Sequence, residues 1–116
     1  MQMSNWNSED EKLAVLAKGA RSRVQANVGA ALRDETGRTY ASAEVAVGSL
    51  SLSAVEMVVA QAVASGSTGV ESIVISPLTD FKVNDSDFNL VSTFAGSGAS
   101  IYVVDQVNSV IDSRTT

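Results

Sequence analysis

The chain has 116 residues, enough for one domain, and 45% of them are apolar, which supports a single modest core. It contains no cysteine and no histidine, so disulfide bonds and thiol catalysis are excluded. The net charge of -5 argues against general nucleic-acid binding, and no apolar run approaches the length of a membrane span. The first ten residues lack a signal-peptide pattern, so we expect a cytoplasmic protein.

Capping residues and hydrophobic spacing predict helices and strands along the whole chain. Ser8 and Glu11 have the spacing of a capping box, and apolar residues after them recur at helical intervals. A turn with Gly37 separates two short strands, which indicates a β-hairpin. Asn84 is a predicted N-cap, where a helix begins. In chain order we expect a helix over 9–23, strands over 27–32 and 39–47, a helix over 51–65, a strand over 70–76, a helix between Asn84 and Gly96, and a strand over 99–104.

This order predicts an α/β fold with a mixed sheet of four or five strands, which opens with the hairpin and has helices on both faces. The segment 107–111 is either a last edge strand or a short tail element. Residues 1–8 and 112–116 are expected to be flexible tails of a single domain that covers 1–116. The helix over 51–65 is apolar on nearly all sides, which predicts burial of most of its surface.

Several short strings keep a common order and spacing over about residues 12–104. They are Val-Gly-Ala-Ala-Leu at 28–32 with Gly37-Arg38, Ala-Glu-Val at 43–45, Leu-Ser-Leu-Ser-Ala-Val-Glu at 50–56, Gln-Ala-Val-Ala-Ser-Gly at 61–66, and Val-Asn-Asp-Ser-Asp-Phe-Asn at 83–89. Together they resemble the small homo-oligomeric cytidine deaminases. The first string matches the hairpin of that family, and the third and last fall on its two zinc motifs. The resemblance implies a three-layer α-β-α fold.

The resemblance also places the active-site positions of the family on this chain. In the family, Cys-Ala-Glu or His-Ala-Glu at one helix start and Pro-Cys-x-x-Cys at the next hold a zinc ion that activates water, while the glutamate shuttles protons. Here Ser53, Asn84 and Asp87 stand at the three ligand positions. Val55 stands at the position of the glutamate, and Val83 replaces the proline.

Of the nucleoside contacts that the resemblance implies, one remains. Ala26 falls where the family has an aromatic residue that stacks on the base, and Ser42 replaces an asparagine that contacts the substrate. Glu44 keeps the acid that is expected to contact the ribose. Glu44 and Ser42 are therefore the candidate ligand-binding residues. The simpler interpretation of Glu44 is an exposed polar residue on a hairpin strand.

The replaced residues argue against zinc chemistry. A serine hydroxyl and an asparagine amide oxygen are poor zinc ligands, and one carboxylate does not hold the metal tightly alone. Val55 neither accepts nor donates a proton, and general acid–base catalysis is typically worth about 10²–10⁴-fold. We therefore expect no zinc, no other cofactor and no catalytic residue. Ser53 with Glu56, and Asn84 with Asp87, are instead expected to cap two helices.

Two other uses of these side chains are weaker interpretations. The carboxylates of Glu44, Glu56, Asp85 and Asp87 are suitable ligands for Ca²⁺ or Mg²⁺, but their spacing matches no recognised metal-binding loop. Ser53 as a hydrolytic nucleophile lacks a histidine or a nearby lysine to activate it. Neither interpretation is favoured.

Three functional hypotheses remain. The favoured one is a deaminase-fold protein without deaminase activity, acting as a structural or protein-interaction module that binds an unidentified protein or forms a homodimer or homotetramer through the helix over 51–65. The alternative is a sensor that binds a nucleoside or nucleotide in the remnant pocket around Glu44. The least favoured is an active zinc-dependent cytidine deaminase whose metal ligands lie outside the motifs.

Overall fold

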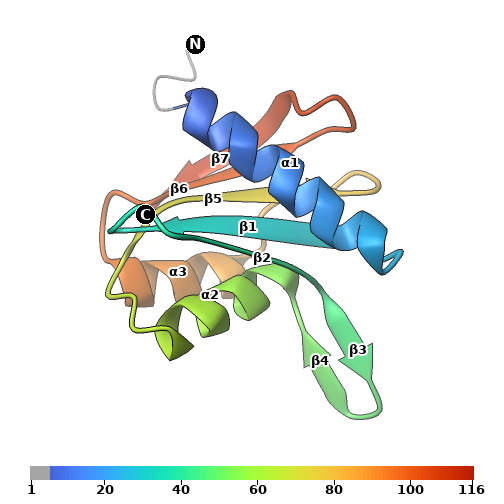
Figure 1. Ribbon diagram of the computed structural model, residues 1–116, viewed down its shortest axis with the longest axis horizontal. Helices are drawn as coiled ribbons and strands as arrows, with labels where there is room; N and C mark the ends of the chain where they lie inside the picture. Colours follow the sequence, from blue (N-terminus) through green and yellow to red (C-terminus); the bar gives the residue numbers. More distant parts are fainter. Residues whose placement is uncertain (1–5) are drawn as a thin grey trace.

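The computed structural model describes residues 6–116 (Figure 1). In chain order its elements are α1 (Ser8–Arg23), β1 (Val28–Asp34), β2 (Thr39–Ala43), β3 (Val45–Val47), β4 (Leu50–Leu52), α2 (Ala54–Ala64), β5 (Val70–Pro77), α3 (Asp85–Ala95), β6 (Ser100–Val104) and β7 (Val110–Thr115). The predicted helices and strands are all present. The predicted strand over 39–47 is divided at Glu44 into β2 and β3. The helix predicted over 51–65 begins only at Ala54, because Leu50–Leu52 instead pair with β3 as β4. None of the helices in the described residues is long and apolar enough to cross a membrane.

Five strands form one mixed sheet in the order β2-β1-β5-β6-β7. β1 is antiparallel to both β2 and β5, β5 and β6 run parallel, and β7 is antiparallel to β6. The central strands β5 and β6 are buried along almost their whole length, because helices cover both faces of the sheet. This arrangement confirms the predicted mixed sheet.

The last strand differs from its prediction. The segment 112–116 was expected to be a flexible tail, but Val110–Thr115 pair with β6 as an edge strand. Thr116 continues the contact, since its N–H donates to the carbonyl of Ala99 at 2.9 Å. Partly buried and exposed residues alternate along β7, whose last four residues are polar, so this edge strand carries little hydrophobic signal in the sequence. At the other terminus, the expected tail over 1–8 mostly lies outside the described residues, and Ser8 already belongs to α1.

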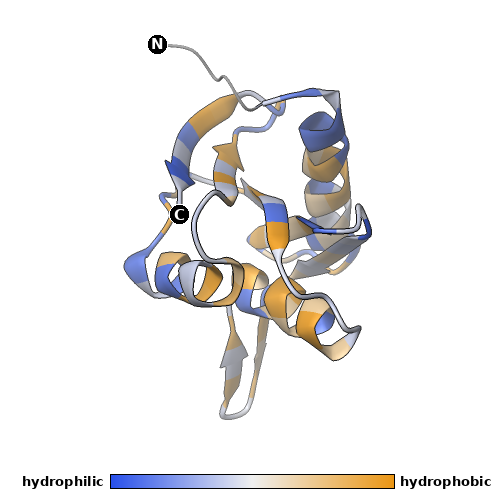
Figure 2. Ribbon diagram, turned by 90° about the vertical axis from the view of Figure 1, so that its left-hand side faces the viewer, coloured by the Kyte–Doolittle hydropathy of each residue, from blue (hydrophilic) through white to orange (hydrophobic). Residues whose placement is uncertain are grey.

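The helices form two layers, with α1 on one face of the sheet and α2 and α3 on the other (Figures 1 and 2). Successive side chains of a strand point to opposite faces of the sheet, so the core consists of two clusters, one on each face. Ala31, Val74 and Tyr102 pack against α1 in one cluster. The larger cluster lies under α2 and α3 and includes Leu32 and Ile73. The three-layer α-β-α architecture is therefore confirmed.

Helix α2 is less buried than its composition predicts. It buries a face that includes Val55, Val58 and Val59, but Val63 is 53% exposed. The reason is its position in an outer layer, where only the sheet and α3 cover it. The apolar outer surface of α2 is therefore open in the single chain.

The first helix begins one residue earlier than predicted, because its capping box uses Asn7 and Asp10. The Oδ1 atom of Asn7 accepts from the Asp10 N–H at 3.0 Å, and an Asp10 carboxylate oxygen accepts from the Asn7 N–H at 3.2 Å. Asp10 is buried and also binds Arg33 of β1 at 3.1 Å. Glu11, the predicted partner of Ser8, is exposed. The ion pair with the sheet is what favours Asp10 over Glu11 at this position.

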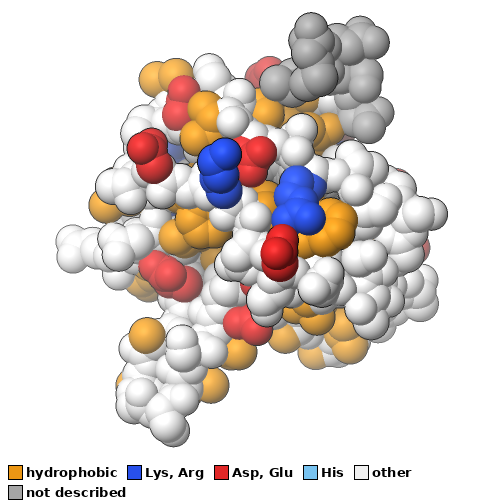
Figure 3. Space-filling view, turned by 180° about the vertical axis from the view of Figure 1, so that it is seen from behind, with side chains coloured by type: hydrophobic (Ala, Val, Ile, Leu, Met, Phe, Trp, Pro, Cys, Tyr) orange, Lys and Arg blue, Asp and Glu red, His pale blue; other side chains and the backbone are white. Residues whose placement is uncertain are grey.

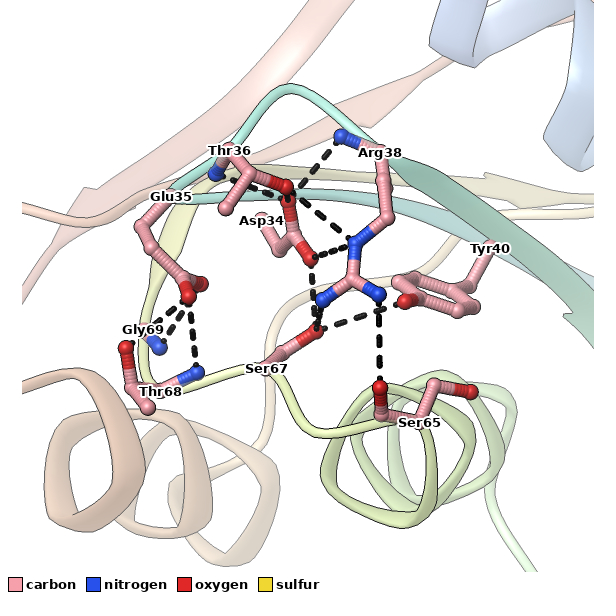
Figure 4. A network of polar contacts seen from close by, with 9 residues as sticks. All are labelled: Asp34, Glu35, Thr36, Arg38, Tyr40, Ser65, Ser67, Thr68 and Gly69. Carbon is pink, nitrogen blue, oxygen red and sulfur yellow. Dashed lines mark hydrogen bonds and ion pairs between the residues drawn. The ribbon is translucent and has the colours of Figure 1, made fainter.

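A network of polar contacts fastens the β1–β2 turn to the segment before β5 (Figure 4). Asp34 is fully buried at the end of β1 and accepts hydrogen bonds from Ser67 Oγ at 2.6 Å, Thr36 Oγ1 at 2.8 Å and the Arg38 N–H at 2.9 Å. The Arg38 guanidinium binds the same carboxylate at 3.0 Å. Burial raises the pKa of Asp34, but the hydrogen bonds from Ser67, Thr36 and Arg38 outweigh it and lower the pKa well below its usual range.

Helix α1 and strand β1 touch at Gly29. A Cβ atom at this position would overlap the carbonyl oxygen of Ala17 and press on Arg21. We expect Gly29→Ala to lower the free energy of unfolding by about 2–3 kcal/mol, because two backbones must separate. Urea unfolding measures the change. Gly19→Ala in the same helix is the control: nothing lies within 4 Å of its added methyl group, so it should instead stabilise the protein by about 0.5–1 kcal/mol. Equal effects at the two positions would contradict the close contact.

Candidate functional site

The predicted caps of α2 and α3 are both confirmed. Ser53 Oγ accepts from the Glu56 N–H at 3.0 Å, and Glu56 Oε1 accepts from the Ser53 N–H at 2.7 Å, which completes a capping box. Asn84 Oδ1 accepts from the Asp87 N–H at 2.8 Å. Each cap satisfies a backbone N–H group that a helix start leaves without a partner inside the helix.

The Asp87 carboxylate joins the two helix starts. Its Oδ1 atom accepts from Ser53 Oγ at 2.8 Å, and its Oδ2 atom accepts from Asn84 Nδ2 at 3.3 Å. Asp87 is only 4% exposed. Burial raises the pKa of Asp87 and nearby Glu56 adds to the rise, while the hydrogen bonds from Ser53 and Asn84 oppose it. Three side chains from two helices thus form one hydrogen-bonded group.

A hollow of about 440 Å³ lies between this group and the β3–β4 hairpin. Its polar lining includes Glu44, Ser53, Glu56, Asn84 and Asp87, with three carboxylates and no lysine or arginine among the lining residues. The hairpin pairs Val45 with Leu52 and projects from the body beside α2 (Figure 1). The hollow is therefore negatively charged. One of its walls is the β3–β4 hairpin, which is not part of the five-stranded sheet.

A smaller hollow of about 160 Å³ reaches the core beside the first. Val55 and Phe81 line it together with Glu44, and Val55 is 1% exposed. Sequence reasoning missed Phe81, whose only signal is that it is the one aromatic residue in the loop between β5 and α3. It also missed the β3–β4 wall, for which the turn residues Gly48-Ser49 are the available signal.

The structure brings one of the two candidate ligand-binding residues to the site. Glu44 lines both hollows, and its Oε2 atom accepts from the Asn27 N–H at 3.2 Å. Ser42 lines a third hollow, beside Arg23 of α1, which Glu44 also lines, and the Ser42 hydroxyl donates to the Ala43 carbonyl at 3.0 Å. Ser42 and Glu44 therefore share this third hollow, but only Glu44 lines the hollow between the helix starts and the hairpin.

Three of the four acids weighed for a hard metal line the hollow, and the fourth does not. Asp85 points to Arg114 of β7, with which it forms an ion pair at 3.1 Å, and it does not line the hollow. Within residues 6–116, no group of three acidic side chains is arranged to hold a metal ion. Glu44, Glu56 and Asp87 share the hollow as separate groups.

A family model described as cytidine deaminase-like matches residues 6–108. The chain belongs to the cytidine deaminase-like family. This confirms the resemblance inferred from the short strings, and the match covers every element from α1 to β6. A search of curated protein sequences gives no match.

Solved structures of cytidine deaminases share the fold of this cytidine deaminase-like chain. The enzyme from Burkholderia pseudomallei superposes with a TM-score of 0.76 at 19% identity, over 100% of this chain and 92% of that one. The enzyme from Mycobacterium leprae gives a TM-score of 0.71 at 17% identity, over 94% of each chain. At these identities the similarity establishes the architecture, and the chemistry of the site rests on its own residues.

Proposed function

We propose that this cytidine deaminase-like protein has no deaminase activity and acts as a structural or protein-interaction module. The observation that carries the proposal is the mutual hydrogen bonding of Ser53, Asn84 and Asp87 at the positions that the family uses for zinc. All three side chains also take part in helix caps. Their polar atoms therefore already have structural partners.

The chemistry of these donors supports the absence of zinc. Protein zinc sites use thiolates, imidazoles and carboxylates, whereas this group offers a hydroxyl, a carboxamide and a single carboxylate. The donor set does not fit zinc. Val55, at the position of the proton-shuttling glutamate, is a buried apolar side chain. No side chain at that position transfers a proton, so the reaction lacks both the metal and the acid–base group.

Deaminase activity is tested by incubating the purified protein with cytidine and measuring released ammonia. We expect no release above the buffer rate, with or without added zinc, because the metal ligands and the proton shuttle are both replaced. Elemental analysis of the same preparation is expected to find far less than one zinc per chain. Zinc-dependent ammonia release would overturn the proposal.

Exposed apolar side chains support the interaction role. Val63 on α2 is 53% exposed, and Val47 and Leu50 on the projecting hairpin are 65% and 49% exposed. Figure 3 shows hydrophobic side chains on the projecting hairpin, seen from behind. Apolar surface of this kind marks contact sites. We propose that it supports a homodimer or homotetramer, or contact with another protein. Sedimentation velocity at micromolar concentration distinguishes a homodimer or homotetramer from a monomer.

The hollow favours a second candidate function, in which the protein senses a nucleoside. Glu44 lies at the place where the family is expected to contact the ribose, and a hollow of about 440 Å³ has the size of a small-molecule site. Its three carboxylates disfavour the phosphates of a nucleotide. An uncharged nucleoside is therefore the better ligand for this pocket.

Thermal unfolding with cytidine, and with cytidine monophosphate, tests the sensor. If cytidine binds, a hundredfold excess over Kd stabilises the fold by about 2.7 kcal/mol, and the monophosphate stabilises it less. Glu44→Ala should abolish the shift, whereas Glu11→Ala on the exposed face of α1 should retain it. No shift with either ligand would exclude the sensor and leave the interaction module.

A further inference from the structure

A second polar hollow, of about 230 Å³, lies on the opposite face of the sheet from the deaminase-like pocket. It sits where the first turn of α1 meets the ends of β1, β5 and β6 (Figure 1). Strand pairing places Arg33, Ser72 and Ser100 in one row across these strands. The next row holds Ala31, Val74 and Tyr102 and packs under α1. The polar row thus begins where the apolar contact with the helix ends.

Two residues that line this hollow each have a buried polar atom without a hydrogen-bond partner within residues 6–116. These atoms are the Nη1 atom of Arg33 and the hydroxyl oxygen of Ser72, and Ser72 is only 2% exposed. A buried donor without an acceptor costs roughly 1–3 kcal/mol, so both groups favour a bound molecule that supplies the partners. The two residues are partners in neighbouring strands, which places their side chains next to each other on one face of the sheet.

The charges around Arg33 select the ligand. The other nitrogens of its guanidinium already bind two carboxylates, with Nε at 2.8 Å from Glu71 Oε1 and Nη2 at 3.1 Å from Asp10 Oδ1. The ionisable groups that line the hollow therefore carry one positive and two negative charges. An anion would add a third negative charge, and a cation would face the N–H groups of Nη1. An uncharged acceptor avoids both penalties.

We infer that this hollow binds a small uncharged molecule that carries a carboxamide or urea group. Its carbonyl oxygen accepts from Arg33 Nη1, and its N–H donates to the hydroxyl oxygen of Ser72. A carboxamide or urea group thus offers one acceptor and one donor, which complement the Arg33 donor and the Ser72 acceptor. The site is separate from the pocket around Glu44 and does not depend on the proposed function of that pocket.

Three probes of nearly equal shape and different charge test the inference: acetamide, acetate and acetamidinium. Each is titrated into the full chain while backbone N–H resonances are followed by NMR. We expect acetamide to give saturable shifts at Ser72, Gly98 and Ser100, which lie at the hollow. Acetate and acetamidinium should bind at least about tenfold more weakly, a difference of about 1.4 kcal/mol.

Ser72→Ala is expected to remove the saturable acetamide shifts, because it deletes the acceptor with a minimal change in volume. Ser76→Ala is the matched control: it removes another buried, unpartnered serine hydroxyl of β5, outside the hollow, and should leave binding unchanged. Arg33→Lys keeps the charge but loses Nη1 and should weaken acetamide binding. Absence of saturable shifts would mean that the hollow takes up water only, and equal or tighter binding of acetate or acetamidinium would exclude selection of an uncharged ligand. Either result would overturn the inference.

Discussion

Replacing Ser53, Asn84 and Asp87 together by cysteine should raise the zinc affinity of this protein at least about a thousandfold. The three side chains already meet, with Ser53 Oγ at 2.8 Å and Asn84 Nδ2 at 3.3 Å from the oxygens of Asp87. Three convergent thiolates leave a fourth position open, as in catalytic zinc sites. Competition with a chromophoric chelator measures the affinity, and the zinc content gives the stoichiometry.

The control replaces the same three residues by alanine, which removes both N-caps without adding ligands. Both triple variants should lose roughly 1 kcal/mol of stability for each cap, but only the cysteine variant should recover stability when zinc is added. It should still not deaminate cytidine, because Val55 cannot transfer a proton. Weak zinc binding by the cysteine variant would show that these positions do not form the counterpart of the family's metal site.

Asp34→Asn should destabilise the fold by about 3 kcal/mol, the second large effect that we expect. The amide cannot accept every hydrogen bond that Ser67, Thr36 and Arg38 donate to the buried carboxylate, and it leaves the Arg38 guanidinium without its counter-ion. Urea unfolding at neutral pH measures the loss. Glu35→Gln, in the same turn, replaces a fully exposed carboxylate that accepts hydrogen bonds from Thr68 and Gly69, and it should cost clearly less than Asp34→Asn.

The same carboxylate predicts a pH dependence. The pKa of Asp34 is lowered in the folded state, so the unfolded chain takes up the proton first as pH falls. The stabilisation is fully present above the ordinary aspartate pKa and is lost as pH decreases below it. The difference in unfolding free energy between wild type and Asp34→Asn should therefore shrink from pH 7 towards pH 2. A difference that is constant with pH would indicate that packing, and not charge, causes the destabilisation.

Local signals in the sequence were sufficient to predict most of the helices and strands, and to predict the two helix starts at the site. Ser53 and Asn84 cap their helices as predicted, because an N-cap depends on residues within three positions of each other. The strand over 70–76 was predicted equally clearly, since its centre over 73–75 is buried and continuously apolar. The predicted N-cap of α1 was wrong by one residue. Two capping boxes are possible from the sequence, and the distant contact between Asp10 and Arg33 favours the one that uses Asp10.

By itself, the sequence determined the order of the elements, the family resemblance and the absence of cysteine and histidine, all of which depend on residue type and local spacing. Only the tertiary structure decided that Ser53 and Asp87, 34 positions apart, share a hydrogen bond, and that Glu44 lines the hollow at the helix starts whereas Ser42 does not. It also decided that Arg33 and Ser72 lie opposite each other across two strands. These relations depend on sheet register and on where a strand ends, and both are set by packing among distant segments.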